Sequence, residues 1–169
     1  MIGRILRSAD FERVLGSPSR ARSSHFAVHH VAASPSLPGK KLSTDAAELS
    51  TGDAPDIHIL VDEGRAQALP QGCWLGSVVP KRHARRAVTR TLLKRQIRAA
   101  FVAQATAEEP LLPGLWVVRL RAPFDVKQFP SASSEALRTA ARVELAQLFE
   151  RARAPQREQQ RPTRARSQA

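Results

Sequence analysis

Apolar residues near the start of the chain are spaced for one face of a short helix. Phe11, Val14 and Leu15 form this face, because residues three and four apart in a helix point the same way. Residues 8–10 (Ser-Ala-Asp) offer N-cap chemistry before it, and residues 16–18 (Gly-Ser-Pro) would end it. The pattern therefore predicts a short first helix.

A strand is predicted over residues 25–31 (HFAVHHV), where apolar and polar positions alternate. Phe26 and Val28 fall on one side of this strand, and Ala27 and His29 fall on the other.

Two later segments, residues 73–79 (CWLGSVV) and 115–120 (LWVVRL), are almost continuously apolar. Such runs are typical of strands covered on both faces. Helical spacing predicts one helix over residues 86–102 and another from about Ser133 or Ser134, either of which could cap it, to about residue 152. The apolar face of this last helix would carry Leu137, Ala141 or Val143, Leu145 and Leu148.

Two segments have the composition of flexible chain. Residues 34–71 begin with a stretch rich in Ser, Pro, Gly and small residues and are expected to form a flexible insertion, with a short strand at 57–61. Residues 153–169 contain Arg, Gln and Pro with almost nothing to bury, so a disordered basic tail is expected.

The order helix, strand, insertion, strand, helix, strand, helix predicts an α+β fold in which helices pack on a small central β-sheet. We expect one domain over residues 1–152.

The chain is strongly basic, with 27 Lys and Arg against 15 Asp and Glu and a net charge of +12. This imbalance favours a polyanionic partner, either nucleic acid or an anionic membrane surface. Arg accounts for 22 of the 27. Arg binds phosphate with two parallel hydrogen bonds and stacks on bases, which suits RNA, although a bias in coding composition explains the same count equally well.

Three observations bear on the compartment. No stretch approaches the roughly 20 apolar residues that span a bilayer, and the first residues lack the apolar run of a signal peptide. Cys73 is the single cysteine, so no intramolecular disulfide can form and a reducing environment is favoured. A soluble, cytoplasmic protein is therefore expected.

The basic residues concentrate on and just before the helix predicted at 86–102, and residues 76–101 contain no acidic residue. The eight basic side chains expected to bind RNA are Lys81, Arg82, Arg85, Arg86, Arg90, Lys94, Arg95 and Arg98. Four of them recur every four residues from Arg86 to Arg98 and form one ridge along the helix.

Unrelieved positive charge on a helix favours a binding role, because like charges four residues apart weaken an isolated helix by a few tenths of a kcal/mol per pair. The apolar residues of this helix fall mostly on the opposite arc and are Val88, Leu92, Leu93, Ile97 and Ala100. One side of the helix is therefore expected to pack on the sheet while the other binds phosphates.

The order of residues in this region resembles a known family. Lys81 and Arg82 follow a strand, Arg-Arg-Ala occupies 85–87, and Arg-x-x-x-Lys-Arg-x-x-Arg occupies 90–98. This arrangement is similar to the protein subunit of bacterial ribonuclease P.

The opening of the chain is similar to that family as well, with Ser-x-Asp-Phe-x-x-Val at 8–14 followed by Phe-x-Val at 26–28. The family signature Arg-Asn-Arg, however, is replaced by Arg90, Thr91 and Leu92. Leu92 lies on the apolar arc and is expected to pack.

The resemblance implies an accessory subunit of a ribozyme, an endoribonuclease in which the RNA itself removes the 5′ leader of precursor tRNA with bound Mg²⁺. The protein would bind the catalytic RNA through the basic helix and hold the leader in a groove between the first helix and the sheet. Carried over by position, the residues lining that groove would be Phe11, Phe26, Val28 and His29. No catalytic residue, metal site or cofactor is expected in the protein itself.

The residues alone leave alternatives open. Phe11, Phe26 and Val28 could equally be plain core residues. A structural protein of the ribosome would share the charge, the tail and a small α+β fold. A DNA-binding helix would need base-reading Asn or Gln among its Arg residues, and Gln96 is the one such residue in this segment.

Overall fold

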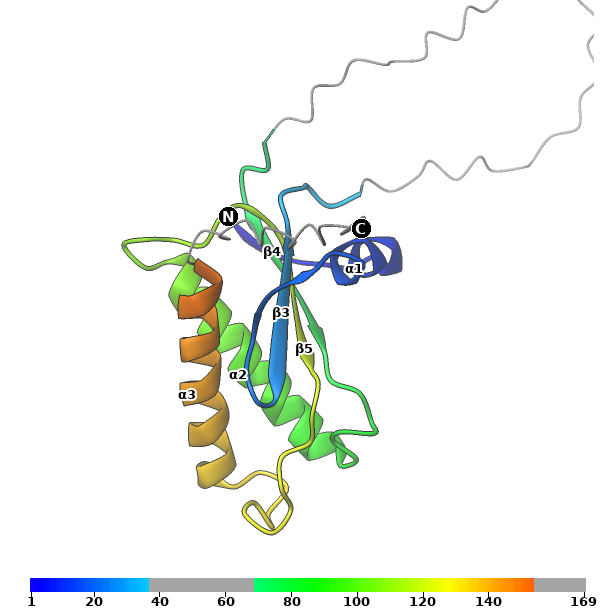
Figure 1. Ribbon diagram of the computed structural model, residues 1–169, viewed down its shortest axis with the longest axis vertical. Helices are drawn as coiled ribbons and strands as arrows, with labels where there is room; N and C mark the ends of the chain where they lie inside the picture. Colours follow the sequence, from blue (N-terminus) through cyan, green and yellow to red (C-terminus); the bar gives the residue numbers. More distant parts are fainter. Residues whose placement is uncertain (37–68, 154–169) are drawn as a thin grey trace, which may run out of the picture.

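The computed structural model describes residues 1–36 and 69–153 of the chain. Within them, one five-stranded sheet lies between a pair of long helices and one short helix (Figure 1). The α+β fold with helices packed on a central sheet is therefore confirmed. Residues 37–68 and 154–169, which include most of the predicted insertion, the strand expected at 57–61 and nearly all of the predicted tail, lie outside the described residues.

The sheet has the strand order β1-β4-β5-β3-β2. The strands are β1 Ile2–Arg4, β2 Ser19–Arg22, β3 Phe26–Val31, β4 Cys73–Val78 and β5 Gly114–Leu120. The helices are α1 Ser8–Leu15, α2 Ala87–Ala105 and α3 Glu135–Arg153. β4 and β5 run parallel and are joined through α2, whereas β3 pairs antiparallel with both β5 and β2.

The edge strands β1 and β2 are not predicted by the sequence analysis. β1 has three residues and β2 has four, and neither shows apolar alternation. These two segments form strands through backbone pairing, in which β1 runs parallel to β4 and β2 runs antiparallel to β3. A strand formed mainly by pairing with its neighbour leaves little trace in its side chains.

The two caps expected from the sequence have different outcomes. Ser134 accepts a hydrogen bond from the backbone N–H of Leu137 at 3.1 Å and caps α3, as predicted. The cap expected from residues 8–10 is wrong, because α1 begins at Ser8 and its N-cap, Arg7, makes no side-chain hydrogen bond. Asp10 is buried instead, and its carboxylate accepts hydrogen bonds from the backbone N–H and the hydroxyl of Ser36.

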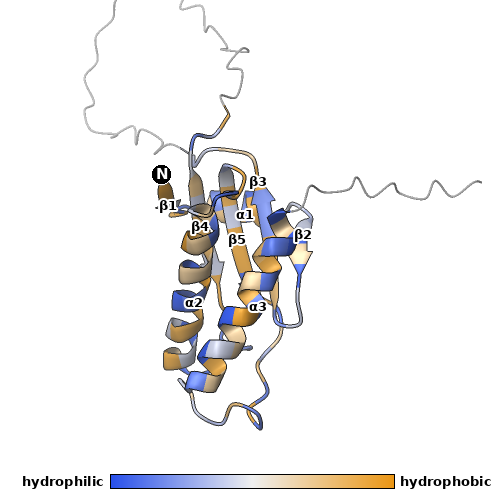
Figure 2. Cartoon of the chain, turned by 90° about the vertical axis from the view of Figure 1, so that its left-hand side faces the viewer, coloured by the Kyte–Doolittle hydropathy of each residue, from blue (hydrophilic) through white to orange (hydrophobic). Residues whose placement is uncertain are grey.

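The main core lies between the sheet and the pair α2 and α3, which lie side by side over one face (Figure 2). Trp116, Phe101 and Phe149 meet at its centre, with ring centroids 6.0 to 6.5 Å apart. All three are fully buried, and each such side chain contributes about 1.5–3 kcal/mol through removal from water.

A smaller core lies on the opposite face, where α1 covers β5 (Figure 1). Val14 packs there against Leu115 and Val117. Phe11 approaches the sheet at Gly76, where an added Cβ would lie 2.4 Å from the Phe11 ring. Glycine at this position therefore leaves room for the Phe11 ring against β4.

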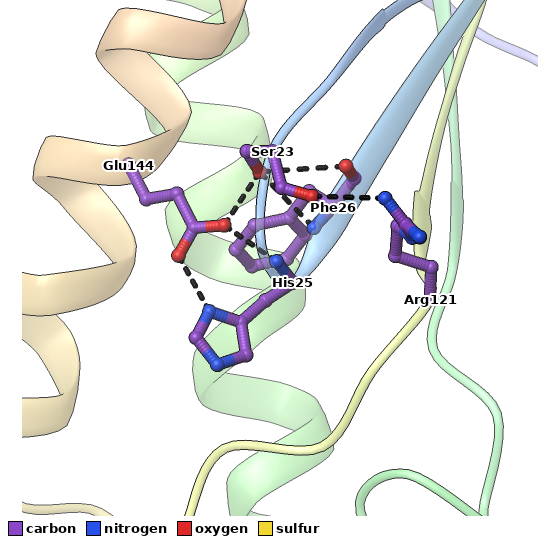
Figure 3. A network of polar contacts seen from close by, with 5 residues as sticks. All are labelled: Ser23, His25, Phe26, Arg121 and Glu144. Carbon is purple, nitrogen blue, oxygen red and sulfur yellow. Dashed lines mark hydrogen bonds and ion pairs between the residues drawn. The ribbon is translucent and has the colours of Figure 1, made fainter.

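A polar cluster joins α3 to the turn between β2 and β3 (Figure 3). The carboxylate of Glu144 accepts hydrogen bonds from the Ser23 hydroxyl at 2.5 Å, the His25 backbone N–H at 2.7 Å and the His25 ring at 2.7 Å. Burial alone would raise the pKa of Glu144, but these hydrogen bonds outweigh it and hold the pKa below its usual value. The cluster therefore fixes α3 against the sheet edge.

We expect Glu144→Ala to lower the free energy of unfolding by roughly 1–3 kcal/mol, because it leaves the half-buried donors of Ser23 and His25 unpaired. Glu150→Ala is the matched control on the same helix. Glu150 is 57% exposed and lies 3.7 Å from its partner Arg153, so its loss should have little effect. Urea denaturation of both variants checks this, and equal effects would contradict it.

The pH dependence of the same site has a definite sign. Because the folded pKa of Glu144 lies below the value of 4.5 expected for the unfolded chain, the ionised carboxylate contributes its full stability above that pH. The contribution is lost as the pH falls through the folded pKa. The difference in unfolding free energy between the natural chain and Glu144→Gln should therefore shrink on acidification below about pH 4.5. A difference that stays constant would contradict this.

Candidate nucleic-acid interface

Helix α2 divides into a buried and an exposed side. Leu92, Leu93, Ile97 and Phe101 are its buried residues and pack in the main core. The expectation that Leu92 packs is therefore confirmed, with 7% of the residue exposed. Val88 differs from the expected apolar arc, since it is 55% exposed and lines a groove between α2 and α3.

Seven of the eight predicted RNA-binding residues are exposed, and they lie on the solvent side of α2 or in the turn before it. They are Lys81, Arg82, Arg85, Arg86, Lys94, Arg95 and Arg98. None of the seven forms an ion pair with another described residue. The first turn of α2 also contains no acidic residue, so positive charge extends to the positive end of the helix dipole.

Arg90, the eighth residue, has a different environment. It is half-buried, and its Nη1 donates to the carbonyl oxygens of Ala84 at 3.0 Å and Arg85 at 2.7 Å. Residues four apart are rotated by about 40° around an α-helix. Arg90 therefore faces the loop before α2, whereas Lys94 and Arg98 face open solvent. Arg90 therefore holds the turn that carries its basic neighbours.

Two arginines of α3 extend the basic surface and were not singled out by the sequence reasoning. Arg138 and Arg142 line the groove between α2 and α3 together with Arg95. None of the described residues lining this groove is acidic. The four-residue spacing of Arg138 and Arg142 on a predicted helix was the available signal.

The four residues predicted to line a leader groove are not brought together on one accessible surface. Phe26 and Val28 are fully buried in the main core, beneath α2 and α3. Phe11 lies on the other face of the sheet and is partly exposed. Along β3, Phe26 and Val28 point to one face of the sheet and His29 points to the other, because successive residues of a strand alternate. In this conformation, Phe26 and Val28 have no surface to offer to RNA.

His29 points toward the face covered by α1 but is only 7% exposed. Its Nδ1 lies 3.0 Å from the carbonyl oxygen of Ser17 and must donate, because a carbonyl only accepts. Burial lowers the pKa of His29, which favours the neutral ring with Nε2 as a buried acceptor that has no partner among the described residues. His29 therefore positions the α1–β2 connection rather than presenting a ring for stacking.

Arg119 is an exposed cation on this face of the sheet that the sequence reasoning missed. It lies two residues beyond Val117 on β5, directly beside Ala27 of β3. Its positive charge also acts on His29. The period of two in residues 115–119, with Leu115 and Val117 buried under α1, was the available signal.

Other chemistry is limited among the described residues. No group of three or more His, Cys, Asp or Glu side chains there could hold a metal ion, and no helix there is long and apolar enough to cross a membrane. Cys73 is buried, and burial raises the pKa of its thiol, which disfavours the reactive thiolate.

The model of the Ribonuclease P family matches residues 3–152. The chain belongs to the ribonuclease P protein family.

Curated relatives in the ribonuclease P family include the ribonuclease P protein component of Ralstonia pickettii (strain 12J), 44% identical over 82 residues, which are 48% of this chain and 54% of the relative. That of Burkholderia pseudomallei (strain 1106a) is 41% identical over 78 residues, or 46% and 55% of the two chains. The chain thus spans about half the length of the curated relatives it matches. The structure of Staphylococcus aureus RNase P protein is similar with a TM-score of 0.49 and 19% identity, covering 87% of this chain and 92% of that one.

The three residues at the position of the ribonuclease P signature lie in three different environments. Arg90 is bonded to the preceding turn, Thr91 is exposed, and Leu92 packs in the core. On α2, the exposed basic side chains beyond the signature are Lys94, Arg95 and Arg98.

We expect Arg90→Ala to lower the free energy of unfolding by about 1 kcal/mol, because two carbonyl oxygens of the preceding turn lose their donor. Lys94→Ala on the same helix is the control and should leave stability unchanged, since Lys94 is exposed. Thermal or urea unfolding checks both. Equal stability of the two variants would contradict the assignment of Arg90 to the turn.

Proposed function

We propose that this chain is the accessory protein of a cytoplasmic ribonuclease P, which binds the catalytic RNA and the 5′ leader of precursor tRNA and assists endonucleolytic removal of the leader. Membership of the family supports this over a ribosomal or DNA-binding role. The observation that carries the proposal is the solvent side of α2, where exposed basic residues have no acidic partner among the described residues.

The catalytic RNA would bind along that side of α2. Each phosphate that a Lys or Arg neutralises releases condensed counterions, so such a surface binds RNA with strong dependence on salt. Lys94 and Arg98 are free to contact phosphates because their side chains are exposed and make no protein ion pair in the described residues. Arg95, Arg138 and Arg142 would continue the contact into the groove between α2 and α3.

The leader would lie on the opposite face of the sheet, beside α1. Phe11 is partly exposed there and offers a ring edge to a base, while Arg119 offers a cation to the backbone. Phe26, Val28 and His29 would support that surface from within, because all three are buried. This assigns the leader a smaller set of contacts than the resemblance alone implies.

We place the hydrolysis itself in the RNA subunit, with its Mg²⁺ bound there. The chain contributes charge and position: it lowers the repulsion between two polyanions and holds the substrate strand in place. Neither role needs a nucleophile or a general base from the protein.

We expect addition of the full chain to its cognate catalytic RNA to lower the Mg²⁺ and precursor tRNA concentrations needed for leader removal. The measurement is a reconstituted processing assay, with and without the protein, across a range of Mg²⁺ concentrations. An unchanged requirement for both would overturn the proposed function.

We further expect Lys94→Glu combined with Arg98→Glu to remove most of the affinity for the catalytic RNA. The slope of log affinity against log salt should become shallower by about 1.5, as the loss of two phosphate contacts requires. Both side chains are exposed, so the fold should be retained by circular dichroism.

Lys127→Glu with Arg151→Glu is the charge-matched control, because both side chains are exposed and lie outside α2. This control should retain most of the affinity. Equal losses in the two double variants would mean that net charge, rather than the α2 surface, determines binding.

A further inference from the structure

The turn before α2 and the connection from β5 to α3 lie at the end of the molecule away from the N-terminus (Figure 1). Residues of both segments line a pocket. Its volume is about 330 Å³, within the range of small-molecule sites. Thr89 of α2 donates a hydrogen bond to the Ala132 carbonyl at 2.7 Å and holds the two walls together. The pocket is therefore formed by fixed elements of the fold.

The interior of this pocket is apolar and partly aromatic. Leu93 and Leu137 line it from the core side, and the half-buried rings of Phe124 and Phe129 line it from the connection. The two rings meet edge to face at 5.7 Å between centroids, and His25 stacks on Phe124 at 3.9 Å. These contacts hold the aromatic wall rigid, which reduces the entropy lost when a flat ligand enters.

The mouth of the pocket is basic. Arg82, Arg85 and Arg86 line it, and none of the described residues lining it is acidic. Val126, at the same mouth, is 73% exposed and adds an apolar side chain there. An apolar interior beneath a positive mouth matches a ligand that joins a flat, weakly polar ring to an anion.

We propose that this pocket binds one unstacked nucleotide of single-stranded RNA, with the base among the apolar side chains and the adjacent phosphates at the arginines. Two observations favour a nucleotide over an apolar peptide segment. The arginines complement phosphate, and the mouth is continuous with the basic surface of α2. The inference rests on the proposed function for its biological context and deepens it. Besides phosphates, the protein would bind a base in this pocket.

The first test compares a short oligouridylate with an abasic ribose-phosphate oligomer of the same length and charge, both bound to the full chain at the same salt concentration. The pocket predicts about tenfold tighter binding of the oligouridylate, because stacking of a base on aromatic side chains is absent in the abasic oligomer. Equal affinities would overturn the proposal.

Phe129→Leu removes a ring from the pocket wall but keeps an apolar side chain. We expect this substitution to reduce the ratio of the affinity for oligouridylate to the affinity for the abasic oligomer toward one. The affinity for the abasic oligomer itself should stay unchanged. A purely structural effect of the substitution would lower both affinities together. A preference that stays at its original value would overturn the assignment of the base to this pocket.

A fluorescent reporter locates the bound base. Val126→Trp places an indole at the mouth of the pocket, and Gln128→Trp places one at an exposed position on the same connection that does not line it. Oligouridylate should quench the emission of the first variant more than that of the second, and the abasic oligomer should quench neither strongly. Equal quenching of the two variants by oligouridylate would overturn the location.

These measurements use oligomers alone, so they separate the inference from the proposed function. A chain that assists leader removal but shows no base preference overturns the pocket and leaves the function standing. A chain that shows the base preference but does not assist leader removal overturns the proposed function and leaves the pocket standing.

Discussion

Helix α2 must satisfy two opposite environments at once, and the rest of the structure depends on this constraint. Its inner side is buried against the sheet and α3 through Leu93, Ile97 and Phe101. Its outer side carries positive charge that no acidic residue among the described residues neutralises. Repulsion on the outer side disfavours the helix, whereas burial on the inner side contributes several kcal/mol in its favour. Packing therefore maintains a charged surface that an isolated helix would not support.

The surrounding contacts hold that surface in place at both of its borders. Arg90 turns back to the loop before α2, so one member of the basic ridge organises the turn that carries the others. Glu144 fixes α3, the packing partner of α2, to the β2–β3 turn (Figure 3). The charged face, the groove between α2 and α3 and the pocket before α2 thus share one rigid support. A surface fixed in this way loses little entropy when it binds a partner.

The sequence predicted what depends on local periodicity, and it failed where tertiary pairing decides. Apolar spacing located α2, α3 and the three central strands because each buries a regular set of side chains. The edge strands β1 and β2 escaped prediction because backbone pairing, rather than side-chain pattern, orders them. In the site, charge spacing identified the exposed ridge, but no local signal showed that Arg90 bonds to the preceding turn. The leader-groove set carried over by resemblance joined residues that alternation along β3 places on opposite faces of the sheet.

The most direct test of the central claim is the chemical reactivity of single lysines in the complex with the catalytic RNA. Lys94 is exposed on the outer side of α2, and Lys127 is exposed on the connection after β5, outside that helix. Amine acylation followed by mass spectrometry reports each of them separately. The account predicts that bound RNA protects Lys94 much more strongly than Lys127. Full reactivity of Lys94 in a saturated complex would contradict it.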